Sequence, residues 1–189
     1  MPKFTFNKSL PKNLALLLKE RAQELGNDIF QYSKDKSGNY TGYSYSQVYD
    51  EIIALALILR KLGIKRGDNV ALISDNRREW ALADYAILSL GASDVPRGCD
   101  SMGTEIRFII SFAGCEYGFF ETPHQLEKVL EKADECPKLK TAIIFKHSSR
   151  DEETVVNNKK IKVLFFDDIM NEGKAIYSAD KENLKKEIE

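Results

Sequence analysis

The segment NVALISDNRREWALADYAILSLGASDVP, residues 69–96, has the pattern of a strand, a helix and a second strand in immediate succession. NVALIS (69–74) is a short apolar run of β type, residues 77–91 have a helical pattern that closes on a glycine, and ASDVP (92–96) is again a short strand. Two strands joined by a helix form a βαβ unit, which predicts parallel pairing and a right-handed crossover.

The alternation of strands and helices continues on both sides of this segment. Toward the C-terminus, the pattern predicts strands at 116–121, 141–146 and 162–167 and helices at 102–114 and 123–135. Toward the N-terminus, it predicts a helix within 10–26, a hairpin of strands 29–33 and 40–44, and a helix within 44–63. Ser44 and Gln47 have the spacing of a capping box, and Thr122 and Pro123 suit the N-cap and first position of the helix at 123–135. We therefore expect an α/β fold: a largely parallel sheet with helices on both faces, preceded by an N-terminal helix and a small hairpin.

Length and composition indicate an ordinary globular chain. It has 189 residues, of which 43% are apolar and 30% charged, and its formal net charge is −1. This length suits one domain with a core, and the charge excludes the basic footprint of a nucleic-acid-binding protein. The longest apolar run, at 52–59, is far shorter than the about 20 residues of a membrane-spanning helix, and the N-terminus lacks the apolar core of a signal peptide. We expect a cytoplasmic protein without a transmembrane segment or a nucleic-acid partner.

Cysteine and histidine residues show no metal-binding or nucleophile motif. Cys99, Cys115 and Cys136 are far apart in the sequence and form no CxxC, and an odd number without close spacing argues against a disulfide framework or a zinc site. We expect free thiols. His124 and His147 have no Cys–His or His–His motif spacing, and we assign neither a catalytic role.

The familiar phosphate-binding and esterase motifs are missing from the sequence. RGCDSMGTE contains Gly98 and Gly103 at the spacing of a P-loop, but Thr104-Glu105 stands where Lys-Ser/Thr is required, and a glutamate would repel phosphate. There is also no GxGxxG and no GxSxG. The sequence therefore predicts neither a P-loop, a dinucleotide fingerprint nor an esterase elbow.

Two adjacent acids, Asp167 and Asp168, follow the last predicted strand. In a receiver-like domain, acids at strand ends hold Mg²⁺. The pair has no clear partner carboxylate or lysine at a matching strand end, so a helix N-cap followed by a first-turn acid is the better interpretation. The polar stretch at 147–160 is predicted to be a surface loop, and 180–189 a short charged helix that needs a packing partner.

The polar stretch SDNRREW within the opening segment admits two interpretations. In one, Asp75 or Asn76 caps a helix whose arginines are solvated and whose Trp80 points into the core. In the other, Arg77 or Arg97 reaches an anion or a partner carboxylate near the strand ends. Residue types alone favour the first.

The order of these motifs resembles the N-terminal part of AMP-forming acyl-CoA synthetases, the long-chain fatty acid–CoA ligases of the adenylate-forming superfamily. The resemblance covers about residues 10–146, and 147–189 only by position. After Pro96 it departs from the commoner Pro-Leu-Tyr turn, which indicates a variant branch. The matching series is Tyr43-Ser44-Tyr45, Gly63 to Val70, Asn76-Arg77-Arg78-Glu79-Trp80, Gly91-Ala92 and Asp94-Val95-Pro96-Arg97-Gly98.

The resemblance implies the N-terminal subdomain of the adenylate-forming fold. The complete enzymes use ATP and Mg²⁺ to convert a fatty acid to acyl-adenylate, and then transfer the acyl group to CoA. Their TSGTTGxPKG loop is missing from residues 1–189, so we expect one incomplete subdomain that is inactive alone, with no catalytic, cofactor-binding or metal-binding residues and no cofactor of its own. The arginines of SDNRREW are expected to pair with parts of the synthetase that this chain lacks. The family-landmark residues are expected to be structural: Asn76, Arg77, Glu79, Trp80, Gly91, Pro96 and Arg97.

Two alternatives to a simple synthetase fragment stay open. The chain could be a free-standing α/β binding module or a receiver-like regulatory module, which would bind a ligand or Mg²⁺ at Asp167 and Asp168. It could also be a non-catalytic subunit that complements a separately encoded remainder of the synthetase. Fatty acid, ATP and CoA are expected as partners of the complete enzyme only.

Overall fold

A computed structural model of the chain describes residues 11–34, 37–146 and 161–180. The predicted surface loop at 147–160 lies outside these residues, as does all but the first residue of the predicted helix at 180–189. Across the described helices, none is long and apolar enough to cross a membrane.

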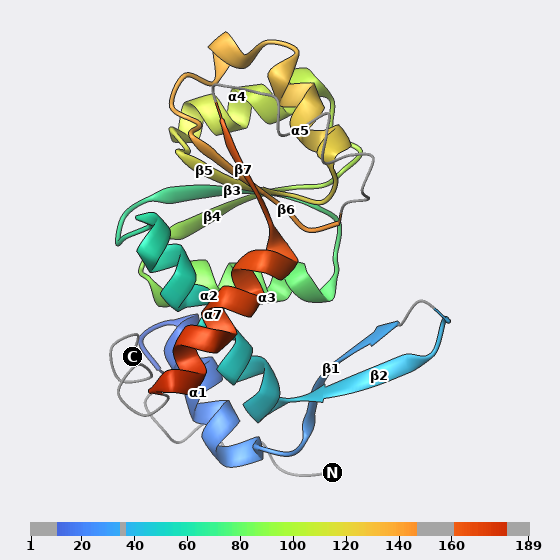
Figure 1. Ribbon diagram of the computed structural model, residues 1–189, viewed down its shortest axis with the longest axis vertical. Helices are drawn as coiled ribbons and strands as arrows, with labels where there is room; N and C mark the ends of the chain where they lie inside the picture. The colour runs from blue at the N-terminus through green and yellow to red at the C-terminus, as the bar shows by residue number, and fades with distance from the viewer. Residues whose placement is uncertain (1–10, 35–36, 147–160, 181–189) are drawn as a thin grey trace.

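The centre of the molecule is a five-stranded parallel sheet in the order β4-β3-β5-β6-β7 (Figure 1). This confirms the α/β fold class expected from the sequence. Its strands are β3 (Asn69–Ile73), β4 (Ser93–Arg97), β5 (Tyr117–Phe120), β6 (Thr141–Ile144) and β7 (Lys162–Phe165). The helices are α1 (Leu14–Leu25), α2 (Tyr45–Leu62), α3 (Arg78–Ser89), α4 (Gly103–Ala113), α5 (Pro123–Leu130) and α7 (Phe166–Ala179), with a 3₁₀ turn η1 (Ala133–Glu135). The predicted hairpin is also present, as the antiparallel strands β1 (Ile29–Lys34) and β2 (Tyr40–Ser44).

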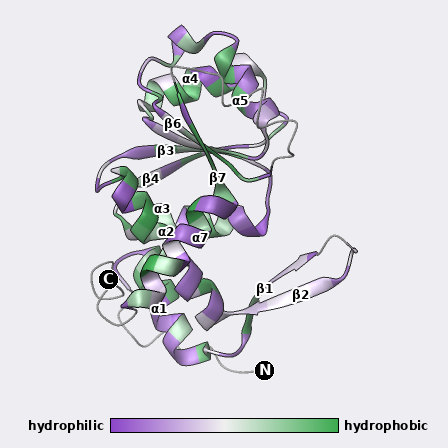
Figure 2. Ribbon diagram, viewed as in Figure 1, coloured by the Kyte–Doolittle hydropathy of each residue, from purple (hydrophilic) through white to green (hydrophobic). Residues whose placement is uncertain are grey.

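Helices cover both faces of the sheet because successive strand residues point in opposite directions. Leu72 and Phe119 face the layer of α1, α2, α3 and α7, whereas their neighbours Ile73 and Phe120 face α4 and α5. All four side chains are fully buried. Both faces of the sheet are therefore apolar. The hydrophobic residues concentrate along the strands and in the helices that pack against them (Figure 2).

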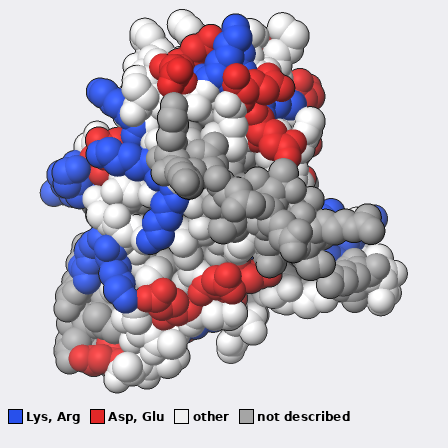
Figure 3. Space-filling view, turned by 45° about the horizontal axis from the view of Figure 1, so that its top comes forward, with Lys and Arg blue, Asp and Glu red and all other residues white. Residues whose placement is uncertain are grey.

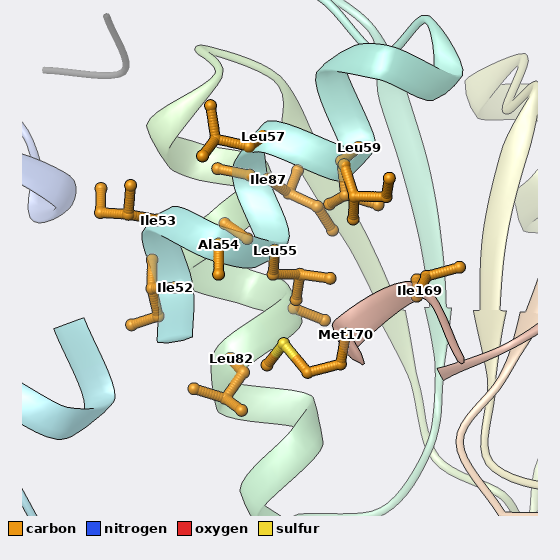
Figure 4. Packing of buried hydrophobic residues seen from close by; sticks show 14 of the residues in the cluster. Ile52, Ile53, Ala54, Leu55, Leu57, Leu59, Leu82, Ile87, Ile169 and Met170 are labelled. Carbon is orange, nitrogen blue, oxygen red and sulfur yellow. The ribbon is translucent and has the colours of Figure 1, made fainter. Parts of the chain in front are cut away.

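Helix α2 is the most deeply buried helix of the larger layer (Figure 4). It begins with the predicted capping box, in which Ser44 Oγ accepts from the Gln47 N–H and Gln47 accepts from the Ser44 N–H. It ends at Gly63, whose φ of 108° is the left-handed conformation of a C-terminal cap. The signals for where this helix begins and ends are thus local in the sequence.

Helix α7 crosses α2 at a point where the two backbones nearly touch. A Cβ atom on Gly173 would lie 3.0 Å from the Ala54 carbonyl carbon and closer still to its oxygen. On either side of this crossing, Lys61 bonds Glu172 at 2.6 Å and Tyr177 donates to Asp50 at 2.9 Å. Only glycine permits this approach, because the obstruction is backbone and cannot rotate away.

The predicted single helix over 123–135 is wrong in its second half. Helix α5 begins as expected, with Thr122 as N-cap and Pro123 at the first position, but it ends at Leu130 and a 3₁₀ turn follows. The cause is a contact distant in sequence: buried Arg107 of α4 binds Glu135 at 2.7 Å. We attribute the early end of α5 to this ion pair.

The two acids at the start of α7 lie in its first turn, and neither of them is the N-cap that the sequence predicts. Phe165 occupies that position and makes no side-chain cap. Asp167 and Asp168 are both exposed. They retain a favourable interaction with the positive end of the helix dipole, but the predicted cap, Asp167, lies two residues after the observed one.

Replacing Gly173 by alanine tests the α2–α7 crossing. The added Cβ would push the two helices apart, and this outweighs the gain in helix propensity of about 1 kcal/mol. We expect Gly173→Ala to lower the free energy of unfolding by about 1–3 kcal/mol in a urea titration. The control is Asn171→Ala on the exposed side of the same helix, which should be neutral or stabilising. Equal effects of the two substitutions would contradict the close approach.

A pair of carboxyl groups joins α3 to the edge strand β4. Burial, followed by repulsion from Asp94 and a hydrogen bond with it, raises the pKa of Asp84 to about 6. Ionised Asp84 therefore destabilises the fold above pH 6, and this penalty disappears as the pH falls toward the unfolded-state pKa of about 3.9. The pair of Asp84 and Asp94 therefore makes a more favourable contribution to the stability of the fold in acid than at neutral pH.

Asp84→Asn should remove this pH dependence. At pH 8 the variant is expected to be more stable than the wild type by about 1 kcal/mol, a figure that discounts the shift for solvent screening. At pH 4 the two should unfold at the same urea concentration, since wild-type Asp84 is then protonated in the folded protein. A stability difference that is the same at both pH values would contradict the carboxyl-pair explanation.

Candidate functional site

The chain reverses its direction across the sheet between β3 and β5. Helix α3 leads from β3 to β4 on one side, and α4 then returns over β3 to β5, from which the chain proceeds to β6 and β7 on the other side. In open parallel sheets, ligands bind outside the carboxyl ends of the strands at such a switch point. The residues that follow β3, β4 and β5 are therefore the first place to look for a site.

Glu121 lies at this switch point and ties the three strand ends together. Its Oε2 atom accepts hydrogen bonds from Ser74 Oγ at 3.0 Å and from the Asp75 N–H at 2.9 Å, both just after β3. It also accepts from the thiol of Cys99, just after β4, at 3.2 Å. One carboxylate oxygen thus connects segments that are 22 to 47 residues apart in sequence.

The charge state of this cluster follows from its surroundings. Burial by itself raises the pKa of Glu121, but the hydrogen bonds and the Arg77 guanidinium, 3.8 Å away, outweigh it and hold the pKa below its ordinary value. Burial and the bond to Glu121 act in one direction on Cys99 and raise the pKa of its thiol to about 12. At neutral pH the cluster therefore holds a carboxylate and a neutral thiol.

The loop between β4 and α4 follows a strand end at the switch point, where a P-loop would lie, and several of its polar groups are bonded within the protein. Asp75 Oδ1 accepts from the Cys99 N–H at 3.0 Å, and Glu105 accepts from the Met102 N–H at 3.1 Å. The carbonyl oxygens of Cys99 and Ser101 accept hydrogen bonds from the Lys128 ammonium, at 3.0 and 3.1 Å. Two N–H groups of this loop, those of Cys99 and Met102, are therefore already bonded to carboxylates of the protein itself.

Arg78 has partners inside this chain. It forms an ion pair with Glu51 of α2 and lies over the Tyr43 ring at 4.0 Å. Lys174 of α7 bonds the same Glu51 at 2.8 Å. The group joins three helices and the hairpin, so Arg78 has a structural role.

Arg77 also has partners in this chain, and it faces the strand ends. Its Nε donates to Glu79 at 2.8 Å, and its guanidinium lies 5.7 Å from the Phe145 ring centre. Arg77 is itself the N-cap of α3 and makes no side-chain cap, so the prediction that Asp75 or Asn76 caps this helix is wrong. Asp75 is instead committed to the loop after β4.

Four of the seven landmark residues line one hollow of about 650 Å³ beside this cluster. Glu79 accepts from Arg77, which in turn lies beside Glu121. Gly91 lies at the other end of α3, with a φ of 69°, packed against Arg66. The strand-end hollow is lined by Ser74, Asp75, Asn76, Trp80, Pro96, Arg97 and Gly98.

Sequence reasoning missed the cluster of Asp75, Cys99 and Glu121. Their ligand-type atoms all lie within 4.8 Å of one another. Each residue is unremarkable in its own segment, and no short motif spacing links them. The available signal was topological: each one directly follows, or nearly follows, a strand that borders the reversal in strand order.

Comparisons with known proteins agree on one family. A sequence profile described as AMP-binding enzyme matches residues 18–183. The long-chain-fatty-acid–CoA ligase FadD15 of Mycobacterium tuberculosis is 31% identical over 116 residues, which cover 61% of this chain and 19% of that protein. Long chain acyl-CoA synthetase 5 of Arabidopsis thaliana is 32% identical over 120 residues, or 61% of this chain and 17% of that protein. The chain thus spans about a fifth of the length of these curated relatives.

Solved structures share the fold. The A domain of carboxylic acid reductase from Segniliparus rugosus, in complex with AMP and a co-purified carboxylic acid, aligns with a TM-score of 0.71 at 17% identity, over 86% of this chain and 30% of that one. The inhibitor-bound N-terminal domain of FACL13 from Mycobacterium tuberculosis aligns with a TM-score of 0.62 at 23% identity, over 78% of this chain and 36% of that one. At these identities the likeness establishes the fold alone.

Glu121→Gln tests the tie across the strand ends. The amide keeps one acceptor oxygen but loses the charge, and we expect the free energy of unfolding at pH 7 to fall by about 1–2 kcal/mol. Because the folded pKa is depressed, the carboxylate stabilises the fold above the unfolded-state pKa of about 4.3, and this contribution is lost as the pH falls through the folded pKa. The wild-type advantage in urea titrations should therefore shrink only below about pH 4.

The matched control is Glu116→Gln. Glu116 pairs with Lys140 at 2.9 Å on the surface, where both side chains are well exposed. Such pairs contribute at most about 1 kcal/mol, so this variant should change the urea midpoint little. A Glu121 effect no larger than that of Glu116 would contradict the tie.

Proposed function

The chain belongs to the family of AMP-binding enzymes, and we propose that it is the N-terminal portion of a long-chain fatty acid–CoA ligase. The observation that supports this most is the family match over residues 18–183, together with the ordered series of motifs from Tyr43 to Gly98. The relatives that are 31% and 32% identical are both named as long-chain enzymes. The complete enzyme would use ATP and Mg²⁺ to form acyl-adenylate and pyrophosphate, and then transfer the acyl group to CoA.

We further propose that residues 1–189 alone do not catalyse this reaction. When the fatty acid carboxylate attacks the α-phosphate of ATP, negative charge develops in the transition state. Cations and backbone N–H donors must be directed at that charge to stabilise it. The sequence has no TSGTTGxPKG loop, and the loop that occupies a similar place after β4 has its N–H groups bonded to Asp75 and Glu105. The chain would supply the packed sheet and the strand-end hollow, and a polypeptide that completes the synthetase would supply the phosphate-binding groups.

The proposed partners are accordingly that completing polypeptide and, in the complete enzyme, fatty acid, ATP and CoA. We place the protein in the cytoplasm. A nucleic-acid partner has no support, because the net charge is −1 and the face in Figure 3 carries separate groups of basic and acidic side chains rather than one basic surface.

A receiver-like role for the chain is less well supported. It would require Asp167 and Asp168 to converge with a further acid at a central strand end. Both instead lie exposed in the first turn of α7, after the edge strand β7. Within the described residues, neither belongs to a group of three metal-ligand side chains.

ATP–pyrophosphate exchange with palmitate and Mg²⁺ tests the proposal in two arms. The purified 189-residue chain should show no exchange above a protein-free blank, and measurable exchange would overturn the assignment of inactivity. In the second arm, residues of this chain replace the matching segment of FadD15, and circular dichroism verifies that the chimera folds. We expect palmitate-dependent exchange by the folded chimera. A folded chimera that activates no long-chain fatty acid would contradict the ligase assignment.

A further inference from the structure

The three strand ends at the switch point bring together a set of metal-ligating atoms that fatty acid activation does not require. We propose that Asp75, Cys99 and Glu121 form a binding site for a single divalent metal ion of the zinc type. Each residue offers one ligand atom, and these atoms lie within 4.8 Å of one another. They come from the ends of three adjacent strands, β3, β4 and β5, so the fold itself brings them together.

The distances are close to those of a tetrahedral site. Zinc lies about 2.3 Å from a thiolate sulfur and about 2.1 Å from a carboxylate oxygen, so two such ligands are about 3.6 Å apart. The sulfur of Cys99 and Oε2 of Glu121 are 3.2 Å apart, and the widest separation in the cluster is at most 4.8 Å. Asp75 is exposed, so its side chain has room to turn toward the other two ligands in exchange for its hydrogen bond from the Cys99 N–H.

The backbone around the cluster is already fixed. The Cys99 N–H donates to Asp75 at 3.0 Å, and Lys128 holds the carbonyls of Cys99 and Ser101. Glu121 is held against Ser74 and the Asp75 N–H. Ligand-bearing segments that are tied in this way need little reorganisation when an ion binds, which favours binding.

Charge explains why this site calls for a cation. The Cys99 thiol donates a hydrogen bond to Glu121 at 3.2 Å. A divalent ion would take the place of the proton: the S–H bond breaks, a sulfur–metal bond forms, the proton leaves to solvent, and nothing is oxidised or reduced. The three anionic ligands would then be balanced by the ion and by Arg77, whose guanidinium lies 3.8 Å from Glu121.

The ligand types select the class of metal. One sulfur and two carboxylates suit zinc and its spectroscopic substitute Co²⁺, whereas Mg²⁺ and Ca²⁺ take oxygen ligands. Three protein ligands leave one tetrahedral position for water or another small ligand. Asp75 also lines the strand-end hollow, so this open position would be accessible from solvent.

Titration of the reduced, metal-free chain with Co²⁺ tests the site directly. We expect one equivalent to bind with a thiolate-to-cobalt charge-transfer band, release of one proton, and displacement by Zn²⁺. Cys99→Ser should abolish the band. Asp75→Asn and Glu121→Gln, verified as folded by circular dichroism, should each weaken binding by about tenfold or more.

Cys136→Ser is the matched control. Cys136 is a buried thiol outside the cluster that bonds the Arg107 carbonyl, and serine can keep that bond. This variant should retain the full cobalt band. Absence of a charge-transfer band in the wild type at micromolar protein, or a band that persists in Cys99→Ser, would overturn the proposal. Neither result bears on the ligase assignment, because exchange by the FadD15 chimera is measured separately and requires no zinc.

Discussion

The enclosure of α2 determines how the rest of the molecule is arranged. Side chains all around this helix are buried, including Ile52, Ile53 and Leu55, so every side of it must be covered (Figure 4). The sheet covers one side, α1 and α3 cover others, and α7 closes the layer by crossing at Gly173. Because α7 follows the last strand, residues at the end of the described chain complete the core around a helix near its beginning.

The order of the strands then determines where polar chemistry can gather. With β4 on one side of β3 and β5 on the other, the segments after these strands must meet, and Glu121 joins them. In a phosphate-binding fold the loop at such a point keeps its N–H groups free for the ligand. Here Asp75 and Glu105 accept from the N–H groups of Cys99 and Met102. Asp75 is also one of the three ligands of the proposed metal site.

The sequence predicted the structure correctly wherever the interactions that determine it are local in the chain. Strand and helix alternation predicted the sheet, and the caps at Ser44 and Thr122 were correct because a cap and its partner are three residues apart. The sequence-based predictions failed where a contact between residues far apart in the sequence determines the local structure. Arg107 ends the helical path before Glu135, and the cluster at Glu121 gathers residues that no motif spacing connects. Strand order, which sets those contacts, is a property of the whole sheet.

The two adjacent arginines of SDNRREW contact different parts of the molecule. Arg78 turns toward the helices and pairs with Glu51 of α2, while Arg77 turns toward the strand ends and Glu121. Cations at a helix N-terminus oppose the dipole, yet each of these is offset by a carboxylate close by. The motif therefore couples the start of α3 to the buried helix on one side and to the switch point on the other.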